Sequence, residues 1–247
     1  MKRKAILIGN TNGLQGVQVD LNNYKKFLMS EMGGAWLESE ILTLKNPSLT
    51  ILNMHVLNIK LNERPDFVFL VFTGHGGYIR KATVFEINEK HETIDESKLW
   101  NIAKRQITIS DCCRGIDTDE LRKSVQLLSD GGKIGQSQAR LIYDKRIMEA
   151  EEQQARFYSC SIGETSIDTG LSGGGLYTKN LLKAIKESKV EKYLTINDAH
   201  EVASRTTKKE ALETEQHNQN PDSRVIRCFH ERQLIIAINP IATRLFG

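Results

Sequence analysis

The sequence predicts an α/β protein with a mostly parallel central sheet. Residues 67–72 form a continuous apolar run that is too short to span a membrane, which is typical of a strand buried on both faces. Short runs of this kind alternate along the chain with segments whose apolar residues recur at helical spacing. Such alternation favours a parallel sheet with helices on both faces.

The first half of the chain supplies most of the predicted strands. Apolar periodicity predicts strands at residues 4–9, 40–44 and 66–73, with helices at 14–32 and 48–62 between them. Pro65 should end the second helix. A small hairpin at 78–87, a short helix beginning at Asp95 and a strand starting at Gln106 are expected next.

The second half begins with a long polar segment at residues 116–154, which could contain helices at 121–128 and 141–152. The pattern then predicts a strand at 156–161, a flexible loop at 170–175, helices at 176–186 and 195–213, and a last strand at 233–238. Thr195 or Asn197 should cap the longer helix. We find no linker, so we expect one domain spanning residues 1–247.

Composition limits the possible partners and location. Lys and Arg number 34 and Asp and Glu 31, so the net charge of +3 is too small to indicate nucleic-acid binding. No stretch of the sequence looks like a signal peptide or a transmembrane span. The four cysteines, two of them adjacent, form neither a disulfide framework nor a zinc spacing, which favours a reducing cytoplasm.

Two of the predicted strands end in residues suited to nucleophilic catalysis. Residues 73–77 read Thr-Gly-His-Gly-Gly, and residues 111–115 read Asp-Cys-Cys-Arg-Gly. In a parallel sheet both ends lie on the carboxyl edge, where open α/β folds bind ligands. His75 could therefore accept the proton of a cysteine thiol and generate the thiolate, which is the nucleophilic form.

These two motifs, 38 positions apart (113 − 75), resemble those of the caspase and metacaspase clan of cysteine peptidases. The resemblance covers nearly the whole chain and is closest to the short prokaryotic members. It implies a three-layer α-β-α sandwich around a mostly parallel six-stranded sheet. It also implies a large-subunit-like part at 1–115, a processing segment at 116–154 and a small-subunit-like part at 155–247.

Two arguments select Cys113 as the nucleophile. The clan's nucleophile directly precedes Arg-Gly, and strand alternation places Asp111 and Cys113 on one side of the sheet and Cys112 on the other. The resemblance implies that His75 acts as base and then as acid. It also implies that the backbone N–H groups of Gly76 and Cys113 form the oxyanion hole.

The resemblance also indicates specificity for a basic residue before the scissile bond. Asp111 matches the metacaspase Asp-x-Cys pattern, and Asp20 ends a run similar to the metacaspase Leu-x-Gly-Cys-x-Asn-Asp, although Val17 and Val19 replace its Cys and Asn. Thr73 occupies a third pocket position. Two carboxylates would favour Arg or Lys, unless Asp20 caps a helix and Asp111 satisfies a turn.

A protease that prefers basic residues could cut itself in the segment 116–154. We expect Lys145-Arg146 to be the cleavage site; the other basic candidates there are Arg122, Lys123, Lys133 and Arg140.

We expect no cofactor. Metacaspases often need calcium, and the acids that could bind it here are Asp95 and Glu96, with Asp119 or Glu120. This group lacks the dense aspartate cluster that a hard cation prefers.

Two alternatives remain. A catalytically silent scaffold of the same fold would keep the architecture without activity. Gly9, Gly13 and Gly16 lie where a nucleotide-binding loop would, but their spacing is not Gly-x-Gly-x-x-Gly. By analogy with prokaryotic caspase-like proteases, we expect a protein substrate and an activating protein partner in stress or antiviral defence, with no direct nucleic-acid or membrane binding.

Overall fold

A six-stranded sheet forms the centre of the protein, and its strand order is β10-β8-β7-β3-β1-β2. The computed structural model describes residues 1–116 and 138–241. The five strands from β8 to β2 are parallel, and only the edge strand β10 is antiparallel to its neighbour. The strands are β1 (Arg3–Gly9), β2 (Ile41–Lys45), β3 (Phe67–Gly74), β7 (Arg105–Cys112), β8 (Gln154–Tyr158) and β10 (Asp222–Arg224). The prediction of a mostly parallel six-stranded sheet is confirmed.

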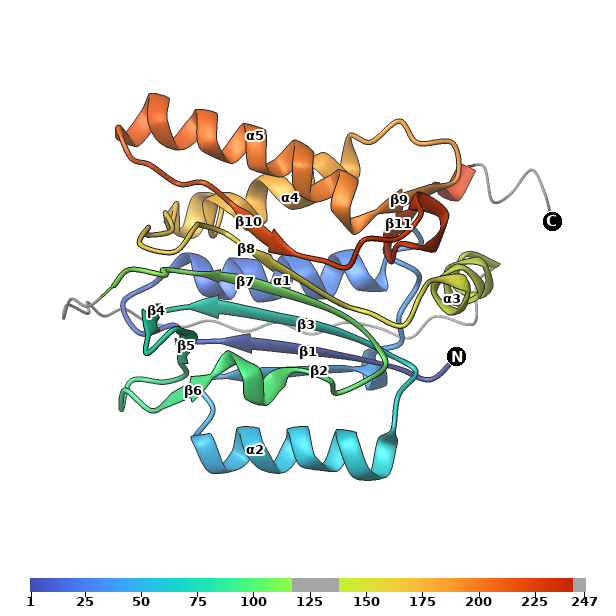
Figure 1. Cartoon of the computed structure of the whole chain (residues 1–247), viewed down its shortest axis with the longest axis horizontal. Coiled ribbons are helices and arrows are strands. Elements are labelled where there is room, and N and C mark those ends of the chain that lie inside the picture. Colours follow the sequence, from blue (N-terminus) through green and yellow to red (C-terminus); the bar gives the residue numbers. More distant parts are fainter. Residues whose placement is uncertain (117–137, 242–247) are drawn as a thin grey trace.

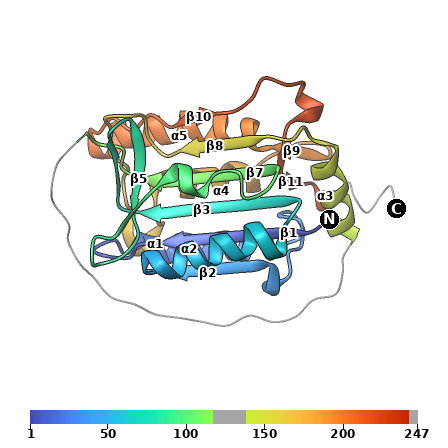
Figure 2. The ribbon, with the colours of Figure 1, turned by 60° about the horizontal axis from the view of Figure 1, so that its bottom comes forward.

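Helices cover both faces of this sheet, so the protein has three layers (Figure 1). Helices α1, α4 and α5 lie on one face and α2 lies on the other, as the turned view also shows (Figure 2). The helices are α1 (Gly16–Met29), α2 (Leu49–Asn58), α3 (Gln138–Glu149), α4 (Leu176–Lys186) and α5 (Ile196–Glu215). Among the described residues, no helix has the length and apolar character needed to cross a membrane.

The alternation of side chains along the strands separates two apolar cores. Phe69 and Val71 of β3 pack with α1, α4 and α5, whereas Leu70 and Phe72 pack with α2. Every residue of β3 is buried, because this strand lies between β7 and β1 with a core on each face. This burial explains why the run is continuously apolar rather than alternating.

Side-chain hydroxyls cap two of the helices, α2 and α5. Ser48 accepts a hydrogen bond from the N–H of Ile51 and caps α2. Thr195 accepts one from the N–H of Asp198 and caps α5, which resolves the choice between Thr195 and Asn197. Helix α3 begins and ends a few residues earlier than the range 141–152 that the sequence predicted.

Two small sheets lie outside the central one. The first contains β4 (Gly76–Ile79), β5 (Ala82–Glu86) and β6 (Thr93–Asp95), and it directly follows β3. The second pairs β9 (Tyr193–Thr195) with β11 (Ile235–Ile238). The strand expected at 233–238 therefore exists in shortened form but is not part of the central sheet.

Candidate active site

The parallel pairing of β3 with β7 brings the two sequence motifs to the same edge of the sheet. Thr73 is in register with Asp111, and Gly74 is in register with Cys112. His75 and Cys113 directly follow these paired positions, and both are half-buried. The N–H of Tyr78 donates a hydrogen bond of 2.9 Å to the carbonyl of Gly115, which fixes the hairpin after His75 against the turn after Cys113.

A backbone carbonyl holds the imidazole of His75. Its Nε2 lies 2.5 Å from the carbonyl oxygen of Asn12. A carbonyl can only accept, so Nε2 carries the proton, and in the neutral ring Nδ1 is free to accept a proton. The N–H of Asn12 donates in turn to the side chain of Asn10, which is fully buried. Sequence reasoning missed Asn12, although it follows β1 at the same edge.

The sulfur of Cys113 is in contact with the backbone of Ser166. The N–H of Ser166 lies 3.5 Å from Sγ, and Sγ lies 3.9 Å from the carbonyl oxygen of the same residue. Burial raises the pKa of the Cys113 thiol, so this conformation favours the protonated sulfur. Among the described residues, no hydrogen bond joins Cys113 Sγ to His75. Catalytic hydrogen bonds are often long in a free enzyme and shorten when substrate binds.

The neighbouring Cys112 points to the other side of the sheet. It is 1% exposed and packs in the core that includes Leu70 and Phe72, and burial raises its pKa well above the ordinary value. The predicted alternation of Asp111, Cys112 and Cys113 about the strand is therefore confirmed.

Gly76 lies against the backbone that carries the nucleophile. A Cβ atom added to Gly76 would be 2.7 Å from Cys112 Sγ and 3.0 Å from the carbonyl oxygen of Cys113. Only glycine fits at such a distance. At Gly77 the nearest atom to an added Cβ would be 3.6 Å away, which is an ordinary contact. The backbones of Gly76 and Cys113, the two expected oxyanion-hole residues, are thus adjacent.

Asp20 is buried on the same side of the sheet as Thr73. Thr73 Oγ1 donates to Asp20 Oδ2 at 2.8 Å, and the N–H of Gly175 donates to both carboxylate oxygens at 3.1 Å. Asp20 is only 1% exposed. Burial, followed by the charge of Asp111, raises its pKa well above the ordinary value. The structure thus brings Asp20 and Thr73 together and places Asp111 nearby.

Asp111 accepts hydrogen bonds at the first turn of α4. The N–H and hydroxyl of Thr178 donate to its Oδ2 at 3.0 and 2.7 Å, and Ser166 Oγ donates to its Oδ1 at 2.8 Å. Burial raises the pKa of this carboxyl, and these hydrogen bonds oppose the rise. Ser166 therefore contacts both the proposed nucleophile and one of the acids, and sequence reasoning did not identify it.

The segment 167–176 covers the two acids, and we call it the covering loop. A Cβ at Gly174 would be 2.0 Å from Asp20 Oδ1, and one at Gly175 would be 2.4 Å from Asp111 Oδ2. The loop is closed on itself by hydrogen bonds from Leu176 N to Ile167 O and from Thr169 N to Gly174 O. The expected pocket is therefore occupied by the protein's own backbone in this conformation.

Asp168 fixes the covering loop to the start of α1. Its carboxylate accepts hydrogen bonds from the N–H of Gly16 at 3.1 Å and from the N–H of Gly170 at 2.9 Å. A nucleotide-binding loop would place a phosphate at such a helix N-terminus. Here the protein's own carboxylate occupies that position, which weakens the nucleotide-binding alternative.

Arg114 has a structural position and does not face the acids. It is 4% exposed, its Nε donates to Thr83 Oγ1 at 3.2 Å, and its Nη1 donates to the carbonyl of Cys160 at 3.3 Å. Its guanidinium lies 4.0 Å from the centre of the Tyr158 ring. These contacts fix the turn that follows Cys113.

The expected self-cleavage site at Lys145-Arg146 lies inside α3. Arg146 is 5% exposed and donates to the carbonyl of Gln233 at 2.9 Å. A protease needs an extended, accessible backbone, which a packed helix does not offer. Of the other basic candidates, Arg140 lies in the same helix, and Arg122, Lys123 and Lys133 lie outside the described residues.

Of the acids considered for calcium, the two that the structure describes have partners within the protein. Asp95 accepts a hydrogen bond from the N–H of Ser97, and Glu96 is buried and bonded to the hydroxyl of Tyr158. Asp119 and Glu120 lie outside the described residues. Within residues 1–116 and 138–241, no three His, Cys, Asp or Glu side chains are grouped to hold a metal ion.

Comparisons with known proteins agree with the fold. The family model described as "Caspase domain" matches residues 2–228. Among solved structures, the protein is similar to caspase-1 from Spodoptera frugiperda, with a TM-score of 0.60 and 13% identity over 90% of this chain and 86% of that chain. At that identity the likeness concerns the fold. No curated protein sequence gives a significant match.

Proposed function

The chain belongs to the caspase-domain family, and from this premise we propose that it is a cysteine endopeptidase that cleaves proteins after Arg or Lys through Cys113 and His75. One observation carries the proposal. The register of β3 with β7 places a histidine and a cysteine at the corresponding ends of adjacent parallel strands. Caspase-family peptidases act on protein substrates, and the apposed backbones of Gly76 and Cys113 suit the chemistry of acyl transfer.

In the proposed reaction, His75 Nδ1 takes the thiol proton as Cys113 Sγ attacks the scissile carbonyl carbon. The N–H groups of Gly76 and Cys113 stabilise the resulting oxyanion. The C–N bond then breaks, and the leaving amine takes the proton from His75. Water attacks the acyl-enzyme with His75 as base, and the Sγ–C bond breaks to release the new carboxylate and restore the thiol.

The preference for a basic residue follows from Asp20, Asp111 and Thr73. Two buried carboxylates next to each other attract a cationic side chain and repel an acidic one. Because Gly174 and Gly175 pack directly on these acids, the covering loop must move before an Arg or Lys side chain can reach them. We therefore propose that the described conformation is a resting state and that a protein partner promotes the movement of the loop.

The setting of this activity is also a proposal. The four cysteines are all unpaired thiols, which fits a reducing cytoplasm. By analogy with prokaryotic caspase-like proteases, we place the enzyme in stress or antiviral defence, acting on proteins and not directly on nucleic acid or membranes. We propose no cofactor for its reaction.

Fluorogenic peptides with Arg, Lys, Asp or Leu before the scissile bond test the proposed function. Wild type should release the fluorophore slowly from the Arg and Lys peptides, because without a partner the covering loop opens only part of the time, and hardly at all from the Asp and Leu peptides. Cys113→Ala and His75→Ala should be inactive. Equal cleavage of the Asp peptide, or activity that persists in Cys113→Ala, would refute the assignment.

A catalytically silent scaffold is the second candidate. It is favoured by the closed covering loop and by the raised pKa of the Cys113 thiol. A scaffold would hydrolyse none of the peptides even after the covering loop is loosened by Asp168→Ala. A resting enzyme would gain activity in that variant, so the same peptide panel separates the two candidates.

A further inference from the structure

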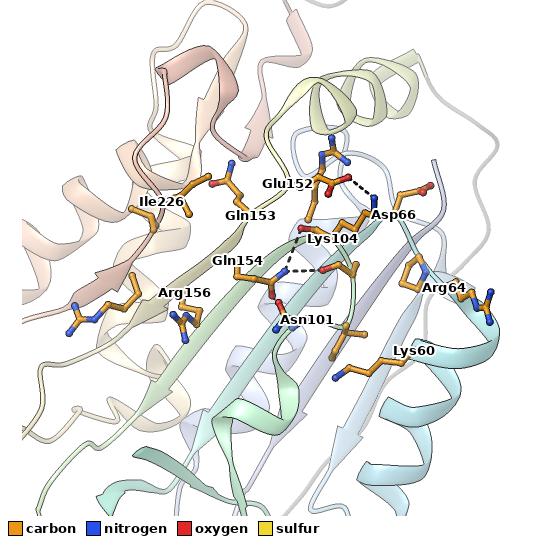
Figure 3. Close-up of a pocket in the computed structure, with 16 residues that line it drawn as sticks. Lys60, Arg64, Asp66, Asn101, Lys104, Glu152, Gln153, Gln154, Arg156 and Ile226 are labelled. Carbon is orange, nitrogen blue, oxygen red and sulfur yellow. Dashed lines mark hydrogen bonds and ion pairs between the residues drawn. The ribbon is translucent and has the colours of Figure 1, made fainter. Parts of the chain in front are cut away.

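A basic cleft lies at the end of the sheet opposite to His75 and Cys113 (Figure 3). Its volume is about 920 Å³, within the range of small-molecule sites. Its walls are residues that precede β3, residues before and at the start of β7 and β8, and residues in and after β10. These are the amino ends of the parallel strands, so the cleft shares no residue with the candidate active site.

Cations outnumber carboxylates in the lining of this cleft. The cationic side chains are Lys60, Arg64, Lys104, Arg105, Arg156 and Arg224, and the acidic ones are Asp66 and Glu152. Both carboxylates already have partners within the protein. Glu152 pairs with Lys104 at 2.9 Å, and Asp66 accepts a hydrogen bond from the N–H of Lys2 at 2.8 Å.

Most of the remaining cations have no acidic partner. Among the described residues, no carboxylate forms an ion pair with Lys60, Arg64, Arg105 or Arg156, and Arg224 pairs with Asp222. Lys60 donates to the carbonyl of Trp100 at 2.9 Å, which uses one of its three donors. The cationic side chains that line the cleft are therefore in excess over its carboxylates.

The environment of Arg156 is the clearest indication that the cleft binds a ligand. Its guanidinium stacks on the ring of Trp100 at 4.0 Å, and its Nε is buried without a hydrogen-bond partner in the described structure. Buried polar groups are rarely left unpaired, because the loss of hydration is costly. The buried carboxylate of Glu96 interacts electrostatically with Arg156 but forms no hydrogen bond to this Nε in the described structure, and it accepts the Tyr158 hydroxyl at 3.0 and 3.1 Å.

A second arginine lies directly opposite Arg156. Arg224 of β10 is its register partner in the antiparallel pair, so both side chains point to the same face of the sheet. Like charges at opposed positions destabilise a sheet. The ion pair of Arg224 with Asp222 offsets part of this repulsion, and an anion bound between the two arginines would offset more of it. Figure 3 shows Arg156 on the β8 side of the cleft and Lys60 on the opposite side, so cations flank it on two sides.

We propose that this cleft binds a small ligand carrying a chain of phosphate groups. Guanidinium groups bind phosphate oxygens through paired N–H donors, and stacking on an aromatic ring holds the guanidinium plane in place. A chain of several phosphates can reach cations on both sides of the cleft, which a single carboxylate cannot. The same chemistry occurs in an inorganic oligophosphate and in a nucleoside triphosphate, and the experiment separates the two.

Isothermal titration of the full chain with tripolyphosphate and with ATP, at physiological ionic strength, tests this proposal. Wild type should bind at least one probe saturably with one site per chain. Arg156→Gln should weaken that binding about 10- to 100-fold, because it removes charge-assisted hydrogen bonds. Arg205→Gln removes the same charge from an exposed position of α5 and should leave the affinity unchanged.

The two probes identify the source of the phosphates. Tighter binding of ATP would indicate a nucleotide, and equal or tighter binding of tripolyphosphate would indicate the phosphate chain alone; both support the site. If Arg156→Gln does not fold, as judged by circular dichroism, Lys60→Gln replaces it. Absence of binding by wild type, or equal affinity in the cleft variant and Arg205→Gln, would overturn the proposal. Neither readout needs peptidase activity.

Discussion

At the scale of single residues, two adjacent thiols have different environments. Cys112 is enclosed by apolar side chains of the α2 face, whereas Cys113 is half-buried at the carboxyl edge and touches Ser166. Alternation along β7 alone produces this difference. Cys112 is therefore enclosed in the core, whereas Cys113 remains partly accessible at the edge of the sheet.

Replacement of each cysteine by alanine separates these environments. Cys113→Ala should abolish peptide cleavage. Cys112→Ala should keep kcat/KM within about threefold and lower the free energy of unfolding by about 1 kcal/mol, because it removes only buried packing. Loss of activity in Cys112→Ala at unchanged fold would show that the assignment of the two thiols is wrong.

Sequence could predict some site residues and not others, depending on the kind of atom that acts. The residues that the sequence could identify are expected to act through their side chains, and they stand in recognisable motifs. They are His75, Cys113, Asp20 and Asp111. Asn12 acts through its carbonyl oxygen, and any residue type supplies a carbonyl, so its identity carries no signal. The contact of Ser166 with Cys113 likewise uses backbone atoms of a distant loop.

At the scale of elements, the hairpin that follows β3 positions the backbone beside the nucleophile. The N–H of Tyr78 is bonded to Gly115, and Gly76 leaves no space for a side chain against Cys112 and Cys113. The strand, the hairpin and the turn after β7 therefore act as one unit. A small displacement of the hairpin would move the proposed oxyanion hole.

Two adjacent glycines give a matched test of this unit. Gly76→Ala should lower kcat on the order of 100-fold, because the new methyl group must push the hairpin away from the backbone of Cys113. Gly77→Ala meets only ordinary contacts and should keep kcat within about threefold. Peptide kinetics with circular dichroism as a check of folding would measure this. Equal losses in both variants would contradict the role of Gly76.

The sequence predicts where an element begins and ends when its buried residues recur at a regular spacing. The limits of α4 agree with the predicted range 176–186, because its inward residues recur at helical spacing. The edge strand β10 was missed because it has only 3 residues, all of them polar. The strand at 233–238 was recognised as apolar, but periodicity does not say which sheet a strand joins, and β11 pairs with β9.

At the scale of the whole molecule, the parts before and after the polar segment share one core. Leu7 and Val71 from the first part pack in the same cluster as Leu181 and Ile236 from the second. The covering loop and α4 belong to the second part, whereas Asp20 and Asp111 belong to the first. The closed pocket is therefore held by contacts between segments that are distant in sequence.

The two buried acids make the stability of the fold depend on pH. The pKa of Asp20 is raised mainly by burial, so its neutral form favours the folded state. This contribution is fully present below the unfolded pKa of about 3.9 and is lost as the pH rises through the folded pKa. Asp20→Asn should therefore raise the melting temperature relative to wild type, and the difference should be larger near pH 8 than near pH 4.

Thermal unfolding at several pH values measures this difference. Glu213→Gln is the control, because it removes an exposed carboxylate on α5 and should show no such trend. A difference between Asp20→Asn and wild type that stays constant with pH would contradict the account of the buried acid. The same variant should also cleave the Arg peptide more slowly, since it loses the carboxyl group that would ionise when a basic side chain enters the proposed pocket.

The central claim is that Cys113 attacks substrates that carry a basic residue. The most direct measurement is intact-mass and peptide mapping after treatment with a peptidyl acyloxymethyl ketone bearing Arg, alongside the same reagent bearing Asp. We predict one adduct of the Arg reagent on Cys113, no adduct in His75→Ala on the same timescale, and little reaction with the Asp reagent. An adduct on Cys112, Cys160 or Cys228 instead, or equal reaction of the two reagents with Cys113, would contradict it.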